Sequence, residues 1–354
     1  MYKDFKDDTW DKFHEAAAGK KIYVWGSGQR GREIARVHRL FSSPWKIAAF
    51  IDRKAEEGME LEGHPVISPQ QFQSEQDSHA VVLISTDRPG KIAQELENMG
   101  VKNYFSYYWF MQSMHDSCYQ PRMNQEALEQ VETLLDDTLS KNLLHCLVEK
   151  RKSGFMDYTD LTMDGPEYFR NEFFSPKEDE IFVDGGGFSG DTVEEFILWT
   201  GGQYQKIYTF EPDPRMADMI RQKAAHWHDV QVVEKGLWNE KIEQKFVLDN
   251  NVYSSRICEF GGGATIQCVP LDDVLCGKPC TFLKMDIEGA EIPALLGAHR
   301  TIVDHKPDLA ICLYHKPSDL WEIPLLLHKW VPEYHFAIRH FGVRYFSTVL
   351  FAWY

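Results

Sequence analysis

Two glycine-rich loops constrain this chain more than any other feature, because each stands between an apolar strand and a helix. One motif, "YVWGSGQRGRE", covers residues 23–33, and the other, "FVDGGGFSGDT", covers residues 182–192. Both satisfy a G-x-G-x-x-G spacing. The glycines concerned are Gly26, Gly28 and Gly31 in the first loop and Gly185, Gly187 and Gly190 in the second. Such loops let a ligand approach the backbone at the start of a helix.

Each loop is also followed by an acidic residue at the end of the next predicted strand. Asp52 ends the strand in "IAAFID", and Glu211 ends the strand in "IYTFEPD". This is the position that holds ribose hydroxyls in nucleotide-binding folds. Spacing alone therefore does not distinguish the two loops.

Apolar strands alternate with amphipathic helices along the whole sequence, which predicts an α/β fold with parallel sheets. In the N-terminal part, strands are predicted at 20–25, 46–52, 80–86 and 101–108, helices at 30–40, from Pro69 and at 90–99, and a turn at 56–66. In the C-terminal part, strands are predicted at 180–184, 206–212, 230–238, 280–286, 308–314, 336–341 and 347–354, and helices at 190–199, 214–226, 289–299 and 320–329. The last two strands should form a hairpin, which places one antiparallel strand in an otherwise parallel sheet.

A length of 354 residues suits about two domains of ordinary size. We expect a small Rossmann-like domain at 1–115, a helical connector at 116–164 and a larger domain at 165–354. Leucine and valine recur at three- and four-residue steps between 124 and 152, which indicates helix in the connector. The aromatic run 104–110 is interpreted as a strand packed against the next domain.

Composition excludes several classes of function. The net charge of −16 argues against a general nucleic-acid or anionic-membrane binder, because such binding needs clustered Lys and Arg. No apolar run reaches the roughly 18 residues of a membrane span. The N-terminal residues do not resemble a signal peptide, so a cytoplasmic protein is expected. Seven scattered cysteines without a CxxC pair indicate reduced core residues, and no metal site is predicted.

Charge separates the two loops. The N-terminal loop carries Arg30 and Arg32 at its helix start, which suits a phosphate. The second loop is acidic, since Asp184 precedes its glycines and Asp191 follows them. A pyrophosphate would be repelled there, whereas S-adenosylmethionine offers a sulfonium and an ammonium as well as two ribose hydroxyls. Asp184 and Glu211 are acceptors of the kind this cofactor needs.

Each of these residues also has a purely structural interpretation. Asp191 and Thr192 fit a helix cap, and Glu211 fits a strand end ahead of Pro212. Together, however, they meet at the carboxyl edge of one sheet, where open parallel sheets bind ligands.

The C-terminal part resembles the FkbM-type S-adenosylmethionine-dependent methyltransferases. The matching blocks, in order, are "FVDGGGFSGDT", "FEPDP", "EKGLWN", "VPLDDVL", "FLKMDIEGAE", "LAICLYHKPSDLWEIP" and "YHFAIRHF…STVLFAWY". The resemblance implies a class I methyltransferase fold, methylation of an oxygen, and a role in polysaccharide or natural-product biosynthesis. It implies that the cofactor is held by Asp184, Gly185, Gly187 and Glu211, that Gly236 and Leu237 lie near its adenine, and that Asp286 lines the methyl-transfer cleft. Phe188 departs from the small residue usual there and is expected to narrow the pocket.

The first 110 residues resemble the small nucleotide-sugar-binding Rossmann-like domain that precedes some sugar-modifying enzymes. The motifs "GSGQRG", "FID" and "EGHPVISPQQ" occur in matching order. A ligand there would contact Gly26, Gly28, Arg30, Gly31 and Asp52. A structural or dimerising role remains the alternative, and a homodimer is compatible with it.

The strand "TFLKMDIEGAE" carries unusual charge for the centre of a sheet. We expect Lys284 to pair with Asp286 or Glu288, because buried charges need partners. Methyl transfer to a hydroxyl often needs a base. His315 ends the neighbouring predicted strand, so His315 or Glu288 is predicted as that base. An ion network without chemistry is the alternative.

The main prediction is an O-methyltransferase whose acceptor is a hydroxyl of a sugar, glycan or nucleotide sugar. If the acceptor is anionic, the acceptor-site candidates are Tyr253, Ser254, Ser255 and Arg256 after the third strand, and Arg339 and His340 at the end of the sixth. Placement of these residues on the surface without a role in binding is the alternative. Two alternatives stay open. One is a nicotinamide-dependent oxidoreductase that uses the N-terminal glycine loop, and the other is a non-catalytic adaptor that retains the cofactor site.

Overall fold

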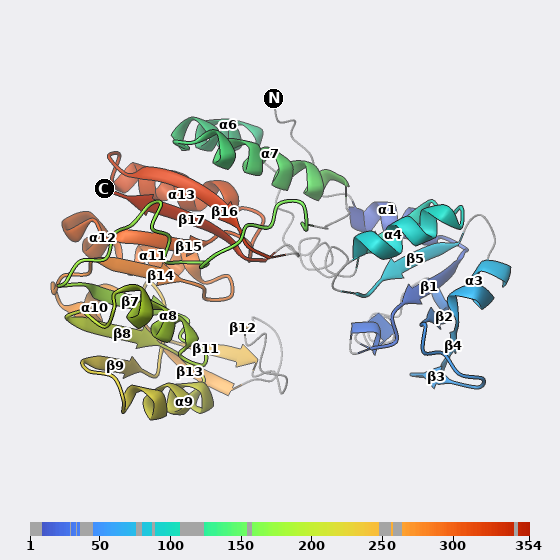
Figure 1. Cartoon of the computed structure of the whole chain (residues 1–354), viewed down its shortest axis with the longest axis horizontal. Coiled ribbons are helices and arrows are strands. Elements are labelled where there is room, and N and C mark those ends of the chain that lie inside the picture. The colour runs from blue at the N-terminus through green and yellow to red at the C-terminus, as the bar shows by residue number, and fades with distance from the viewer. Residues whose placement is uncertain are drawn as a thin grey trace.

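A computed structural model of the chain describes residues 9–28, 30–32, 34–35, 45–75, 80–86, 89–106, 124–153, 158–247, 256–257, 264–342 and 346–354. Figure 1 shows two α/β domains, with helices α6 (Gln125–Leu134) and α7 (Thr138–Ser153) running above the C-terminal one towards the other. The predicted α/β fold class is confirmed.

The N-terminal domain is a six-stranded sheet in the order β3-β4-β2-β1-β5-β6. Its elements are α1 (Thr9–Ala17), β1 (Lys21–Trp25), β2 (Lys46–Ile51), β3 (Glu60–Leu61), β4 (His64–Ile67), α3 (Pro69–Glu75), β5 (Val81–Ile84), α4 (Pro89–Asn98) and β6 (Asn103–Ser106). Strands β4, β2, β1, β5 and β6 pair in parallel, as alternation predicts. The turn predicted at 56–66 instead contains the short β3–β4 hairpin, which turns through Glu62 and Gly63 at positive φ.

The connector forms two helices where one continuous helical stretch was expected. Leu135 bridges to Phe336, and the backbone N–H of Asp136 donates to the carbonyl of Phe336. The Asp137 carboxylate then accepts the backbone N–H of Ser140 at 2.7 Å and so caps α7. The break therefore ties the connector to a strand of the C-terminal sheet.

The C-terminal domain contains a seven-stranded sheet in the order β16-β17-β15-β14-β7-β8-β9. Its strands are β7 (Ile181–Gly185), β8 (Lys206–Phe210), β9 (Val230–Val233), β14 (Phe282–Met285), β15 (Asp308–Cys312), β16 (His335–His340) and β17 (Thr348–Trp353), and its helices are α8 (Asp191–Trp199), α9 (Pro214–Ala224), α10 (Leu271–Leu275), α11 (Glu291–Leu296), α12 (His299–His305) and α13 (Asp319–Trp330). Strand β17 pairs antiparallel with β15 and with β16. The predicted antiparallel last strand is confirmed.

A second, four-stranded sheet stands beside this one in the order β10-β13-β11-β12, and the sequence patterns did not reveal it. It contains β10 (Gly236–Leu237), β11 (Ile242–Val247), β12 (Arg256–Ile257) and β13 (Ala264–Val269). The single strand predicted at 230–238 is therefore divided between two sheets, because the chain turns at Lys235, whose N–H donates to the carbonyl of Val233. The helix predicted at 289–299 is likewise divided, and Gly297 separates α11 from α12.

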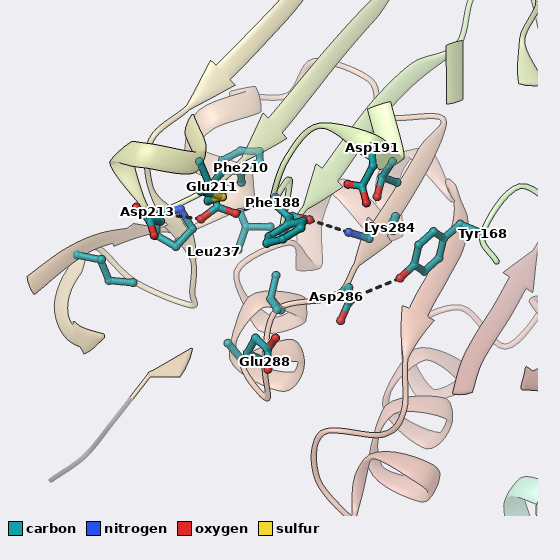
Figure 2. A pocket seen from close by; sticks show the side chains of 18 of the residues that line it. Tyr168, Phe188, Asp191, Phe210, Glu211, Asp213, Leu237, Lys284, Asp286 and Glu288 are labelled. Atoms are coloured by element: carbon teal, nitrogen blue, oxygen red, sulfur yellow. Dashed lines mark hydrogen bonds between the residues drawn. The ribbon is translucent and has the colours of Figure 1, made fainter. Parts of the chain in front are cut away.

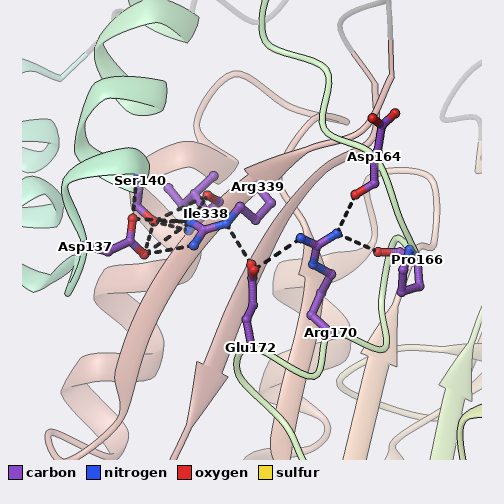
Figure 3. Close-up of polar contacts among 8 residues, drawn as sticks. All are labelled: Asp137, Ser140, Asp164, Pro166, Arg170, Glu172, Ile338 and Arg339. Carbon is purple, nitrogen blue, oxygen red and sulfur yellow. Dashed lines mark hydrogen bonds and ion pairs between the residues drawn. The ribbon is translucent and has the colours of Figure 1, made fainter.

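An arginine and carboxylate network fastens the segment 158–174 against the C-terminal sheet (Figure 3). Arg339 on β16 donates to Glu172 at 3.0 Å and also to Asp137 and Ser140 of the connector. Arg170 approaches the other side of Glu172 at 3.3 Å. The network therefore links α7, β16 and the segment that leads into β7. No helix in the described part of the chain is long and apolar enough to cross a membrane.

Candidate active site

A cavity of about 430 Å³ opens at the carboxyl ends of β7, β8 and β14. This is the edge at which parallel sheets bind ligands, since the strand-to-helix loops converge there. Strand β10 and the segment ahead of β7 complete the wall. The second glycine loop, and not the first, borders this cavity.

The loop packs its glycines against the neighbouring strand. Gly186 has φ +85°, and a Cβ there would collide with the carbonyl oxygen of Asp286. A Cβ on Gly187 would collide with the hydroxyl of Thr209. Gly186 itself lines the cavity, whereas Gly185 and Gly187 lie behind the lining. Only glycine therefore fits between the cavity and the ends of β8 and β14.

Lys284 pairs with Asp184, which corrects the predicted partnership with Asp286 or Glu288. The ammonium lies 3.0 Å from the Asp184 carboxylate, and it also donates to the carbonyls of Gly185 and Gly186. Burial lowers the pKa of Lys284, but Asp184 and Asp286 raise it further, and the pKa lies above its ordinary value. The register of β7 against β14 sets this pair, since Lys284 and Asp184 are direct neighbours.

One end of the cavity is apolar around Glu211. The Glu211 carboxylate accepts the N–H of Phe188 at 2.8 Å and the N–H of Asp213 at 2.8 Å. Burial raises its pKa to about 7. Apolar side chains surround it, namely Phe210, Pro212, Met216, Leu237 and Ile266. Such an end suits a planar base beside a hydroxyl-bearing sugar.

The other end is polar and centres on Asp286. Tyr168 donates to one carboxylate oxygen at 3.0 Å, and Tyr314 donates to the other at 2.7 Å. Figure 2 shows Asp286, Lys284 and Tyr168 across Phe188 from Glu211 and Leu237. Burial raises the pKa of Asp286, but Lys284 and His315 lower it below its ordinary value. Asp286 is therefore held as a carboxylate.

His315 stands behind Asp286 and outside the cavity lining. Its Nε2 lies 3.4 Å from Asp286 and its Nδ1 lies 2.9 Å from the buried Glu291. Burial lowers the pKa of His315, yet Glu291 and the other nearby carboxylates raise it to about 10. At neutral pH the ring is an imidazolium, so this form supports Asp286 and does not accept a proton. Glu288 lines the rim, on a turn with φ +56°.

Most of the remaining predicted cofactor residues line the cavity, and Asp184 lies buried behind it. Phe188, Asp191, Thr192, Gly236 and Leu237 line the cavity, as do Glu211 and Asp286. Asp184 is fully buried, and its second oxygen accepts the hydroxyl of Thr209 at 3.0 Å. The site residues that sequence reasoning missed include Glu167, Tyr168, Asp213, Arg215 and Tyr314. Glu167 and Tyr168 come from outside the sheet, where no strand or loop pattern marks them.

The cavity is strongly acidic. Among the described residues, seven carboxylates line it, and the two cationic side chains, Lys284 and Arg215, are each paired with an aspartate. The carboxylates are Glu167, Asp191, Glu195, Glu211, Asp213, Asp286 and Glu288. This environment favours a cationic ligand, as the charge pattern predicts.

In the N-terminal glycine loop, Asp52 is hydrogen-bonded to the loop itself, and two of the glycines are tightly packed. Asp52 accepts the N–H and the hydroxyl of Ser27 at 3.0 and 2.7 Å. A Cβ on Gly26 would lie 2.5 Å from the hydroxyl of Ser85, and one on Gly31 would collide with the carbonyl of Gly26. Gly28 has open space at that position, and Arg30 starts the helical turn.

Two of the predicted acceptor-site residues serve the fold instead. Arg339 is buried in the network described above, and His340 is fully buried with its Nδ1 2.8 Å from the hydroxyl of Thr348. Both lie on β16, which packs against α7, so neither faces the cavity. Tyr253, Ser254 and Ser255 lie outside the described residues, as does the side chain of Arg256.

The sheet order, the antiparallel β17, the glycine loop and the acidic cavity define a class I methyltransferase fold. Residues 184–342 match the family described as "Methyltransferase FkbM domain". This domain belongs to that family, and it is an S-adenosylmethionine-dependent methyltransferase domain.

One solved structure has a similar fold over nearly the whole chain. The crystal structure of Methyltransferase FkbM from Methylobacillus flagellatus has a TM-score of 0.77 at 21% identity and covers 98% of this chain and 93% of that one. Aeropyrum pernix fibrillarin with bound S-adenosyl-L-methionine has a TM-score of 0.34 at 10% identity, covering 50% and 67%. A SAM-dependent methyltransferase from Aquifex aeolicus has a TM-score of 0.30 at 14% identity, covering 52% and 86%. No curated protein matches the chain.

Proposed function

We propose that this protein transfers a methyl group from S-adenosylmethionine to a hydroxyl of a sugar, glycan or sugar-bearing metabolite in the cytoplasm. The observation that carries the proposal is the acidic cavity at the sheet edge, with Glu211 at an apolar end and Asp286 at a polar end. A cationic cofactor with an adenosine group matches both ends, because its adenine is apolar and its charged portion suits the polar, acidic end.

The adenosine end would lie against β8 and β10. Glu211 would accept the ribose hydroxyls, and Gly236 and Leu237 would contact the adenine. The glycine loop would face the amino-acid portion of the cofactor, since Gly186 presents backbone to the cavity. Asp191 and Thr192 would contact that portion from the first turn of α8. Asp184 would act from behind by holding Lys284 and the loop.

The cofactor supplies an electrophilic methyl group when it is bound. The residues of the polar end would then hold an acceptor oxygen in line with the bond that breaks. Asp286 is fixed by Tyr168 and Tyr314, so its carboxylate can orient an acceptor hydroxyl without moving. The N-terminal domain would present or orient a sugar carrier beside this cavity.

The test is calorimetric titration with S-adenosylhomocysteine. Wild type should bind with micromolar affinity. Glu211→Ala should weaken binding at least tenfold, because it removes the carboxylate that accepts two backbone N–H groups and that would accept the ribose hydroxyls. Glu178→Gln, an exposed charge outside the cavity, serves as the matched control. Absence of binding to folded wild type would refute the proposal.

Turnover separates an enzyme from an adaptor. S-adenosylhomocysteine release should be measured with a panel of nucleotide sugars and oligosaccharides. Turnover with a hydroxyl acceptor supports O-methylation, whereas turnover confined to amine or thiol acceptors would contradict it.

A further inference from the structure

Glu167 is one of the cavity carboxylates that the sequence patterns and the family resemblance leave without a role. It is half-buried and lines the polar end, one residue before Tyr168. It comes from the segment ahead of β7 and not from the sheet. The neighbouring phenol of Tyr168 donates to Asp286, and the charge of Glu167 interacts with that of the same carboxylate.

The backbone around Glu167 is clamped from behind by Arg170. Its guanidinium donates to the carbonyl of Asp164 at 3.0 Å and to the carbonyl of Pro166 at 3.4 Å. Gly165 between them has φ +102°, and a Cβ there would lie 3.0 Å from the same guanidinium. Arg170 is 9% exposed. A buried cation that donates to two carbonyls of one turn holds the backbone of that turn through charge-assisted hydrogen bonds.

This clamp is itself anchored to the rest of the domain. Glu172 lies between Arg170 and Arg339, and Arg339 binds Asp137 and Ser140 on the connector (Figure 3). The backbone turn ahead of Glu167 is therefore linked through Arg170 and Glu172 to β16 and α7.

We propose that Glu167 is the general base that accepts the proton of the acceptor hydroxyl, and that Arg170 is its positioning residue. The inference rests on the proposed function and deepens it, since it assigns the proton transfer at the same cavity. In the step, the acceptor oxygen forms a bond to the methyl carbon while the bond from that carbon to sulfur breaks. The sulfur keeps the electron pair and becomes a neutral thioether. The hydroxyl proton passes to the Glu167 carboxylate.

The other candidates suit the task less well. Asp286 has a pKa below its ordinary value, so it accepts a proton weakly near neutral pH. His315 is an imidazolium outside the lining. Glu288 has 42% of its side chain exposed, at the rim. Glu211 lies across Phe188 at the apolar end (Figure 2), held by two backbone N–H groups.

The surroundings of Glu167 match a base that works near neutral pH. Burial and Asp286 raise its pKa to about 7, while Ser347 and Lys284 act in the opposite direction and Glu195 adds to the increase. Tyr168 and Cys312 also interact with its charge, and the pKa of both is well above the ordinary value. Glu167 is therefore the carboxylate at the polar end of the cavity whose pKa lies near neutral pH, as the pKa of Glu211 does at the apolar end.

The test uses sinefungin, an analogue of the cofactor that carries an amine in place of the methyl-bearing sulfonium. Its affinity is compared with that of S-adenosylhomocysteine, which has no charge there. In wild type the affinity for sinefungin divided by the affinity for S-adenosylhomocysteine should rise about tenfold between pH 6 and pH 8, because the Glu167 carboxylate near the transferred methyl ionises over this range. Effects of Glu211 on the shared adenosine group cancel in this ratio.

Glu167→Gln should leave S-adenosylhomocysteine binding within about threefold of wild type and remove the pH dependence of the ratio. Glu178→Gln controls for loss of one charge on the same segment. A ratio that keeps its pH dependence in Glu167→Gln, or loses it in Glu195→Gln instead, would overturn the assignment. Failure of wild type to bind S-adenosylhomocysteine would refute the proposed function itself, so the two failures are distinguishable.

A positioning role for Arg170 has its own signature. Arg170→Lys keeps a cation at this position and should retain part of the pH dependence of the affinity ratio. Arg170→Gln should lose that pH dependence while its binding of S-adenosylhomocysteine stays intact. Equal loss of both ligands in the two variants would show a structural role alone and would overturn the positioning assignment.

Discussion

Lys284 and Asp184 form an ion pair of 3.0 Å in which the two side chains are 2% and 0% exposed. The pair lies directly beneath the glycine loop, since Lys284 also donates to the carbonyl oxygens of Gly185 and Gly186. Asp184 therefore shapes the cofactor cavity from behind it.

Breaking this pair should be costly. Lys284→Met leaves a buried carboxylate without its cation, and we expect the free energy of unfolding to fall by about 3–5 kcal/mol. Combining it with Asp184→Asn should recover much of that loss, because no unpaired charge then remains. Urea denaturation of the three variants measures the coupling, and simple additivity of the two single changes would contradict it.

The glycine loop should not tolerate a side chain at position 186. Gly186→Ala introduces a Cβ that collides with the carbonyl oxygen of Asp286 at a residue with φ +85°. We expect a loss of more than about 2 kcal/mol in stability together with loss of S-adenosylhomocysteine binding. Gly202→Ala is the matched control, because Gly202 has φ +78° with nothing within 4 Å of the Cβ position. It should cost about 1 kcal/mol and leave binding unchanged. Comparable effects of the two changes would mean that backbone strain alone explains the loss.

Cofactor affinity should depend on pH through Glu211. Because the pKa of Glu211 is raised to about 7, the carboxylate gains a proton as the pH falls from 8 to 6 and loses acceptor capacity. We expect S-adenosylhomocysteine to bind roughly tenfold more weakly at pH 6 than at pH 8. Calorimetry across this range tests it. Glu211→Gln should bind weakly at both values, and a slope that persists in that variant would assign the effect to another group.

Ionisation of Glu167 should lower the stability of the folded protein, although the ionised form is the one that would accept a proton in catalysis. Its pKa in the folded protein, about 7, exceeds the ordinary value of 4.5, so folding favours the protonated form. The contribution of Glu167 to stability is therefore greatest at low pH and declines as pH rises towards 7. Glu167→Gln should raise the free energy of unfolding by on the order of 2 kcal/mol at pH 8 and much less at pH 5. Thermal unfolding without cofactor at the two values measures this. Equal shifts at both pH values would show that ionisation is not the cause.

Much of the fold could be read from the sequence because it depends on local pattern. The apolar strands and the glycine loop predicted β7 and β8, and the closely spaced last strands predicted the β16–β17 hairpin. The four-stranded sheet was missed, because β10 and β12 contain two residues each and carry no periodicity. The break at Leu135 was missed as well, since it depends on pairing with Phe336, about 200 residues away.

The acidic character of the site and the closeness of His315 to Asp286 followed from the order of residues along strands, although His315 lies outside the cavity lining. The ion-pair partners of these charged residues did not follow from the sequence. Lys284 has Asp286 two residues away and Asp184 one hundred residues away, and the parallel register of β14 with β7 decides in favour of Asp184. Protonation of His315 likewise requires Glu291, which reaches it from α11.

The sequence by itself determined the alternation of strands and helices, the glycine loop and the supply of carboxylates, because hydrophobic period and glycine spacing are local properties of the chain. Only the tertiary structure decided which carboxylates face the cavity and which are buried behind it. Glu167 reaches the cavity from outside the sheet and Asp184 is withdrawn from it, because burial and charge pairing depend on neighbours that folding alone brings together.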